Sequence, residues 1–206
     1  MTSSTRTSSA HPPVADVYGL VLAGGASRRM QHDKALIDYH GEPQLRWTYR
    51  LLASLLPRVF VSVKAGQRDE PVRGELPQIV DAHDDAGPAA GILAAQALYP
   101  EVAWLVVACD LPRLDAATLR RLLDARDPAR EATAFISSHD GLPEPLCALW
   151  EPASHARLVA RVEAGRLCPR KVLIEGDTQL LQPYTVHALD NINTPEELAR
   201  LRESTP

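Results

Sequence analysis

The residues best suited to chemistry form one short string near the start of the chain. It reads Leu22-Ala23-Gly24-Gly25-Ala26-Ser27-Arg28-Arg29-Met30 and is followed by Asp33-Lys34. Glycines let a backbone approach a ligand closely, and successive backbone N–H groups can then hold phosphate oxygens. Arg28 and Arg29 can bind phosphate through their guanidinium forks, and Lys34 adds a point charge. The string predicts a phosphate-binding loop, although it matches neither common glycine-rich phosphate motif. The alternative is a surface turn with solvated charges.

A second candidate is Asp110, which directly follows the apolar run Trp104 to Cys109. Such a run indicates a buried strand. A carboxylate at the carboxyl end of a buried strand is well placed to hold Mg²⁺ against a triphosphate. The alternative is an ordinary turn residue in front of Leu111-Pro112.

A third candidate is Asp81, at the end of another short apolar run. A buried carboxylate can accept hydrogen bonds from a base with two adjacent donors, as guanine has. The nearby Asp84 and Asp85 are interpreted as solvated loop residues. Gly87 and Gly91 can open a helix whose N-terminus faces the ligand.

Two further groups have weaker support. Asn191 and Asn193 could face a metal or phosphate, but the helix cap at Thr194 explains that segment equally well. The basic residues Arg166 and Arg170-Lys171 could neutralise an acceptor phosphate or form a solvated helix face. A Ser–His–Asp triad has no support, and a glycosidase carboxylate pair fits poorly beside a phosphate-binding string.

The elements that must position these residues alternate along the chain. Strands are expected at Val17 to Ala23, Val59 to Val63, Ile79 to Asp81, Trp104 to Ala108, Thr133 to Ile136 and Leu146 to Trp150. Helices are expected after Pro43, at Gly91 to Leu98, after Asp115, at Pro152 to Glu163, at Arg170 to Glu175 and after Thr194. The stretch Ala65 to Pro77 is interpreted as a surface loop. This alternation predicts an α/β fold, Rossmann-like, with a mostly parallel sheet and helices on both faces. Ligands then bind at the carboxyl ends of the strands.

Length and composition favour a single domain. The chain has 206 residues and a formal net charge of −4, so nothing indicates a nucleic-acid partner. Residues 1–13 are expected to be a disordered extension, and 14–206 the folded domain. The three cysteines form no C-x-x-C pair, which argues against disulfides or a thiolate metal site. No apolar run could span a membrane and no signal peptide is evident, so we expect a cytoplasmic protein.

From Val17 to Arg202 the sequence resembles the molybdenum cofactor guanylyltransferases, the MobA-like branch of the nucleotidyltransferases. The string at residues 22–34 and Asp81 carry part of the resemblance. The rest is carried by Gly87-Pro88-Ala89-Ala90-Gly91, Cys109-Asp110-Leu111-Pro112, Glu144-Pro145-Leu146 and Asn191-Ile192-Asn193-Thr194-Pro195-Glu196-Glu197-Leu198.

The resemblance implies transfer of GMP from GTP to molybdopterin (as Mo-molybdopterin), with Mg²⁺ as cofactor. It also suggests contact with molybdenum-insertion and molybdoenzyme-maturation proteins. It assigns Mg²⁺ to Asp110 and catalytic roles to Lys34, Arg28, Arg29 and Asp110. The nucleotide is assigned to Leu22, Ala23, Gly24, Gly25, Lys34, Asp81, Gly87 and Asp110.

The sequence departs from the family pattern at two positions. Gln31 stands where the family usually has Gly, and Ser62 stands where some members have Asn near the base. Two alternatives therefore stay open. One is a related nucleotidyltransferase that uses CTP or another phosphorylated acceptor, and the other is a nucleotide-binding regulator without catalysis. The Gly-Gly pair at positions 24 and 25 favours GTP, because cytidylyl-transferring relatives usually have Ala-Gly there.

Overall fold

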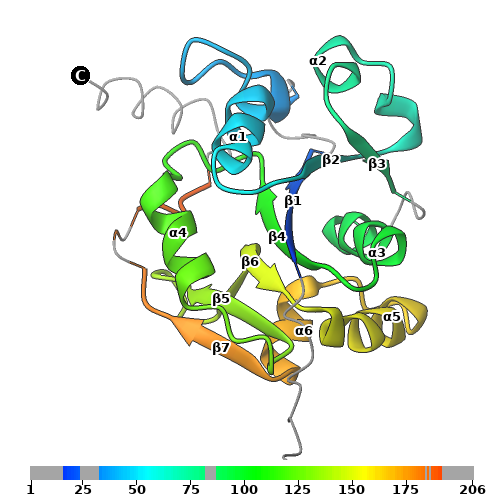
Figure 1. Ribbon diagram of the computed structural model, residues 1–206, viewed down its shortest axis with the longest axis vertical. Coiled ribbons are helices and arrows are strands. Elements are labelled where there is room, and N and C mark those ends of the chain that lie inside the picture. Colours follow the sequence, from blue (N-terminus) through cyan, green and yellow to red (C-terminus); the bar gives the residue numbers. More distant parts are fainter. Residues whose placement is uncertain (1–15, 24–32, 82–86, 184, 186, 192–206) are drawn as a thin grey trace, which may run out of the picture.

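Seven strands form one sheet through the middle of the molecule (Figure 1). The computed structural model describes residues 16–23, 33–81, 87–183, 185 and 187–191. The strand order is β3-β2-β1-β4-β6-β5-β7, and within the described ranges only β6 runs antiparallel to its neighbours. The bounds are β1 Val17–Leu22, β2 Val59–Val63, β3 Gln78–Val80, β4 Ala103–Ala108, β5 Ala132–Ile136, β6 Pro143–Trp150 and β7 Thr178–Leu181.

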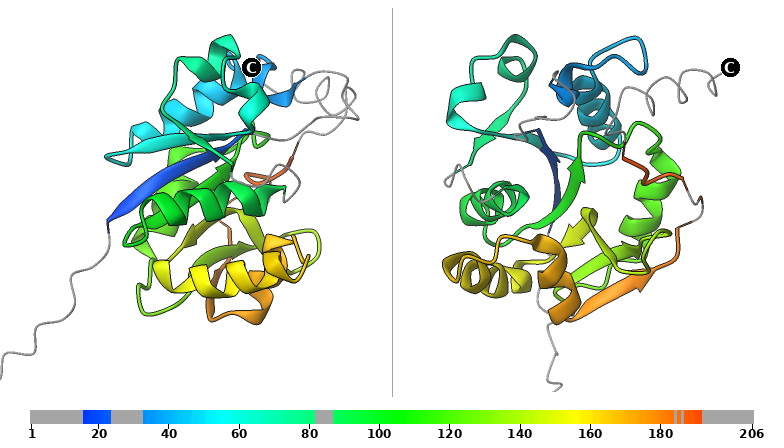
Figure 2. Two further views of the ribbon diagram at one scale, coloured as in Figure 1. Left: turned by 90° about the vertical axis from the view of Figure 1, so that its right-hand side faces the viewer. Right: turned by 180° about the vertical axis from the view of Figure 1, so that it is seen from behind.

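Helices cover both faces of this sheet (Figures 1 and 2). The helices α1 Gln44–Ala53 and α4 Ala116–Asp124 pack on one face. On the other face lie α3 Pro88–Leu98, α5 His155–Glu163 and α6 Pro169–Glu175. The predicted α/β fold with a mostly parallel sheet and helices on both faces is confirmed.

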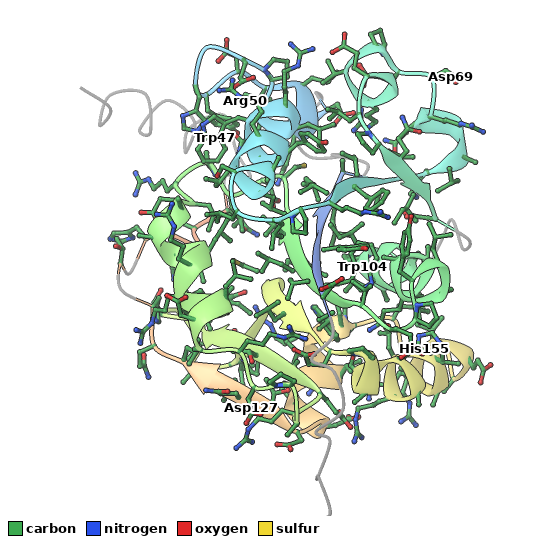
Figure 3. All side chains as sticks on the ribbon, viewed as in Figure 1. Trp47, Arg50, Asp69, Trp104, Asp127 and His155 are labelled. Atoms are coloured by element: carbon green, nitrogen blue, oxygen red, sulfur yellow. The ribbon has the colours of Figure 1, made fainter. Side chains whose placement is uncertain are left out.

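The central strand β4 explains why the core has two halves. All six of its residues are buried, as expected for a strand covered on both faces. Leu105 and Val107 face the α1–α4 core, whereas Trp104 and Val106 face the α3–α5 core. Figure 3 shows Trp104 on the side of the sheet where α3 lies. The alternating side chains thus fix the sheet between two helix layers.

Local signals in the sequence set the helix boundaries. Asp115 caps α4, and its Oδ1 accepts a hydrogen bond from the Thr118 backbone N–H at 2.7 Å. Leu119 and Leu122 form the fully buried stripe of that helix. Pro43 precedes α1, as expected from its fixed φ angle.

One expectation needs correction, one strand was not expected, and two predicted segments lie outside the described residues. Ala65 to Pro77 is not a simple surface loop, because it contains the 3₁₀ turn η2 (Ala65–Gln67), the helix α2 (Pro71–Gly74) and a fully buried arginine. The strand β7 was not expected. The predicted helix after Thr194 and the predicted extension 1–13 lie outside the described residues.

The helices in the described part of the chain include none that is long and apolar enough to cross a membrane.

Candidate active site

The candidate residues gather on one side of the sheet, where the parallel strands end. Ala23 follows β1, Asp81 follows β3, and Asp110 comes two residues after β4. Backbone hydrogen bonds hold these ends in register: the Asp81 N–H donates to the Val63 carbonyl at 2.9 Å, and the Cys109 N–H donates to the Leu22 carbonyl at 3.2 Å. We call this the carboxyl side of the sheet. The register of a parallel sheet thus gathers residues that are far apart in sequence.

One charged pair at this side joins Lys34 to Asp110. Lys34 Nζ lies 3.1 Å from Asp110 Oδ2, although 76 residues separate them. The two side chains are 16% and 21% exposed, so a ligand can reach both. Lys34 begins a 3₁₀ turn, η1 (Lys34–Leu36), whose cap is Asp33. The strand end therefore supplies the carboxylate and the turn supplies the ammonium.

Asp81 has a partner that the sequence did not reveal. Ser62, in β2, is 2% exposed, and its hydroxyl donates to Asp81 Oδ1 at 2.6 Å. A hydrogen bond to one oxygen fixes the plane of the carboxylate, which can accept further bonds. Nothing in the spacing of residues 62 and 81 identifies this contact, because it depends on the pairing of β2 with β3.

The glycines of the Gly-Pro-Ala-Ala-Gly string have separate roles. Gly87 caps α3 with φ +57° and ψ −142°, a conformation that side chains disfavour. Gly91 lets α3 approach the sheet: a Cβ there would overlap Ser62 Oγ and lie 2.9 Å from both Ser62 Cβ and Leu22 Cδ2. The close approach of α3 therefore depends on Gly91.

Cys109 lies beside the site but is no nucleophile. Burial and the nearby carboxylates of Asp110 and Asp33 raise the pKa of its thiol to about 12, despite the opposing charges of Arg73 and Lys34. A thiol of this kind is protonated at neutral pH and is unreactive.

A second polar group occupies the same side of the sheet, beyond β4. Asp190 accepts from His139 Nε2 at 2.9 Å and from His187 Nδ1 at 2.7 Å. Burial raises the pKa of Asp190, but the hydrogen bonds and the charges of the two histidines together lower it overall. Arg170 pairs with Asp140 and Glu144 at 2.7 Å and 3.2 Å.

Arg166 and Arg170, which the sequence analysis grouped as one basic run, lie in different places. Arg170 faces the start of β6 through Glu144, on the carboxyl side. Arg166 instead lines a separate surface hollow with Arg157 and Arg161 of α5. The predicted basic group around residues 166–171 is therefore divided between two places.

Several predicted site residues lie outside the described ranges. They are Gly24, Gly25, Arg28, Arg29 and Asn193. Their assigned roles stay predictions. Leu22 and Ala23 lead into that segment, with Ala23 2% exposed.

The site thus combines partly exposed carboxylates after β3 and β4 with the Lys34 ammonium, a set of groups that suits a metal-bound nucleoside triphosphate. Residues 19–188 match the model of the MobA-like NTP transferase domain. The chain therefore belongs to the MobA-like NTP transferase family. This confirms the resemblance stated from the motifs and the enzyme class that it implied.

Relatives of known name support the same family. Over 188 residues the chain is 34% identical to a molybdenum cofactor guanylyltransferase of Pseudomonas aeruginosa, covering 89% of this chain and 93% of that protein. Over 185 residues it is 37% identical to a molybdenum cofactor biosynthesis bifunctional protein of Synechocystis sp.. That match covers 90% of this chain but 53% of the relative, so the chain spans about half of that protein.

A solved structure shows the same fold. Molybdopterin-guanine dinucleotide biosynthesis protein A from Archaeoglobus fulgidus superposes with a TM-score of 0.75 at 23% identity. The superposition covers 90% of this chain and 97% of that one.

Proposed function

We propose that this protein transfers GMP from Mg²⁺-bound GTP to the phosphate of molybdopterin, carried as Mo-molybdopterin, and releases pyrophosphate. The observation that carries the proposal is the Lys34–Asp110 pair at the carboxyl side of the sheet, with Asp81 on the same side. The names of the two relatives supply the acceptor and the base.

The residues present suit a magnesium ion that arrives with its nucleotide. Mg²⁺ is usually held by one or two carboxylates together with substrate phosphates. Asp110 offers one partly exposed carboxylate, and the described residues contain no group of three or more His, Cys, Asp or Glu side chains that could hold a metal by themselves. When bound, Mg²⁺ would neutralise phosphate charge and polarise the α-phosphate. Asp110 would hold it.

Lys34 neutralises the Asp110 carboxylate before nucleotide binds. When the triphosphate arrives, the ammonium can turn toward a phosphate oxygen, because the four-carbon side chain of lysine is flexible. Arg28 and Arg29 follow the glycine pair in the sequence, and we assign the remaining phosphate charge to them. Charge offset of this kind is the main requirement for phosphoryl transfer.

The acceptor needs no general base. Its phosphate oxygen is already ionised at neutral pH and attacks the α-phosphorus in line, while pyrophosphate leaves from the opposite side. No residue of this chain has to form a covalent intermediate, which agrees with the inert thiol of Cys109.

The base is assigned to the other end of the site. Asp81 lies after β3, three strand positions from β4, or about 14 Å at roughly 4.8 Å per strand. A carboxylate held by Ser62 can accept from the two adjacent N–H donors of guanine. Cytosine lacks that pair of donors, so Asp81 favours GTP over CTP.

We expect the reaction to take place in the cytoplasm and the acceptor to be delivered by molybdenum-insertion proteins. The delivery partner follows from the family to which the chain belongs, and the compartment is part of the same proposal.

The test is pyrophosphate release with Mg²⁺ and Mo-molybdopterin, with GTP, CTP, ATP or UTP added in turn. We expect pyrophosphate release with GTP and none with CTP, ATP or UTP. Lys34→Met and Asp110→Asn should each reduce kcat by at least ~10² to 10³-fold, while the thermal unfolding midpoint changes little. Pyrophosphate release with CTP and not with GTP would overturn the assignment of the base to guanine. Full activity in both variants would overturn the assignment of Lys34 and Asp110 to the active site.

A further inference from the structure

Arg73 lies inside the protein next to the candidate site. Its side chain is 1% exposed, and it comes from α2, in the stretch that sequence analysis interpreted as a surface loop. Burying a guanidinium requires carboxylate partners, because an isolated charge is costly in a low-dielectric interior. The partners of Arg73 therefore indicate what holds it there.

Two of these partners flank the glycine-rich segment. Arg73 Nη2 donates to the Ala23 carbonyl at 2.9 Å and lies 2.8 Å from Asp33 Oδ2. Ala23 is the residue before the segment 24–32 and Asp33 is the residue after it. One guanidinium nitrogen thus ties together both ends of the predicted phosphate-binding string.

The third partner anchors Arg73 itself. Glu70 Oε2 lies 3.2 Å from Arg73 Nη1 and also accepts from the Arg73 backbone N–H at 3.0 Å. Glu70 caps α2 in this way. Glu70 therefore holds the guanidinium within α2, while Ala23 and Asp33 hold it on the side of the glycine-rich segment.

The contacts continue to the charged pair of the site. Asp33 uses its other oxygen, Oδ1, to accept from the Ala35 N–H at 3.0 Å, which fixes the first turn of η1. Lys34 is the first residue of that turn, and its Nζ reaches Asp110. The orientation of Asp33 thus determines the position of the Lys34 backbone at the beginning of η1.

The surroundings of Arg73 do not favour a role limited to stabilising the fold. Its Nε is buried with no hydrogen-bond partner among the described residues. Buried ion pairs add little net stability, and well-packed apolar residues often replace them without loss. Its nearly complete burial also prevents direct contact with a nucleotide. A residue with these properties fits the task of holding other groups in place.

We propose that Arg73 is a positioning residue for triphosphate binding, which fixes both ends of segment 24–32 and, through Asp33, places Lys34. The inference rests on the proposed function for its reaction but not for its ligand class, because any nucleoside triphosphate would meet Lys34. Arg73 itself does not touch the substrate.

The test compares Arg73→Lys with a matched control, Arg126→Lys. Arg126 also forms a buried pair, with Glu151 at 2.6 Å and 2.8 Å, but Glu151 follows the end of β6, which lies at the opposite side of the sheet. Lysine keeps the charge and loses the fork. We expect Arg73→Lys to lower kcat/KM by about 10²-fold, as misplacement by about 1 Å can do. Arg126→Lys should lower the thermal unfolding midpoint about as much as Arg73→Lys does, but it should leave kcat/KM unchanged.

A double-mutant cycle with Lys34 separates positioning from general destabilisation. The readout is the Kd of Mg²⁺-GTP by calorimetry, which needs no acceptor. Arg73→Lys should raise the Kd of Mg²⁺-GTP about 10-fold when Lys34 is present. In the Lys34→Met background it should raise the Kd less than about 2-fold, since the effects of coupled residues are non-additive. Asp33→Asn, at a partly exposed position, should reproduce the effect without threatening the fold.

Equal losses in both backgrounds, or an effect no larger than that of Arg126→Lys, would overturn the role of Arg73. A wild-type protein that binds only another triphosphate would overturn the proposed function instead, and the same cycle with that nucleotide would then decide the role of Arg73. Binding of none of the four triphosphates would overturn both.

Discussion

Replacement of Gly91 by alanine tests how the packing of α3 and the proposed base site at Asp81 depend on each other. The new Cβ would overlap Ser62 Oγ and lie 2.9 Å from Ser62 Cβ and Leu22 Cδ2, well inside ordinary van der Waals contact. The Ser62 hydroxyl could rotate away only by giving up its 2.6 Å bond to Asp81. The Ser62 Cβ cannot rotate away at all.

The magnitude follows from two opposing effects. Overpacking of this severity costs about 3 kcal/mol, whereas replacing glycine by alanine inside a helix returns about 1 kcal/mol. Gly91→Ala should therefore lower the free energy of unfolding by about 2 kcal/mol. The Kd of GTP should also rise, because Asp81 loses the hydrogen bond that fixes its plane.

A second substitution makes the reasoning specific. Ser62→Gly removes both Ser62 atoms from the overlap and leaves only the Cδ2 end of the flexible Leu22 side chain. In that background Gly91→Ala should be neutral or slightly stabilising, which is a coupling of about 2 kcal/mol. GTP affinity should stay weak, because Asp81 still lacks the hydrogen bond from the Ser62 hydroxyl.

The assay is urea unfolding of the four proteins together with calorimetric titration of Mg²⁺-GTP. Additive losses of stability in the double variant would refute the proposed packing of Gly91 against Ser62. Restored GTP affinity in the double variant would refute the role of Ser62 in orienting Asp81.

Two further predictions concern titratable groups. Maleimide at pH 7 should label the exposed Cys168 in the folded protein and leave Cys109 and Cys147 unmodified, because burial raises the pKa of both thiols; mass spectrometry of tryptic peptides checks this, and rapid labelling of Cys109 would contradict it. The hydrogen bond from Arg157 lowers the pKa of Glu131 below its ordinary 4.5, so this pair stabilises the fold above that pH and loses its effect as the pH falls through the lower, folded-state pKa. Arg157→Gln should cost less than about 1 kcal/mol at pH 7, since Arg157 is partly exposed, and the difference from wild type in urea unfolding should shrink below pH 4; a constant difference would be contrary to this account.

The sequence by itself determined the class of fold and the side of the sheet where the candidate site lies. Asp81 and Asp110 each end an apolar run, and the ends of parallel strands meet at one side of a sheet. Caps such as Asp115 and prolines such as Pro43 are local signals, which explains why the starts of α1 and α4 were predictable. The motifs at residues 22–34, 81, 87–91, 109–112, 144–146 and 191–198, taken together and in this order, also indicated the family.

The tertiary structure decided which of these residues meet. The Lys34–Asp110 and Ser62–Asp81 contacts cross 76 and 19 residues of chain, and no local spacing encodes them. Strand β7 has a weak apolar pattern, with no fully buried residue, so periodicity could not reveal it. Arg73 is the clearest case: an arginine in a four-residue helix has the sequence signature of a solvated surface residue, and only the packing of α2 against the ends of the glycine-rich segment buries it. Local sequence fixes caps and periodicity because they act within a few residues, whereas long-range pairing exists only once the sheet brings its strand ends together.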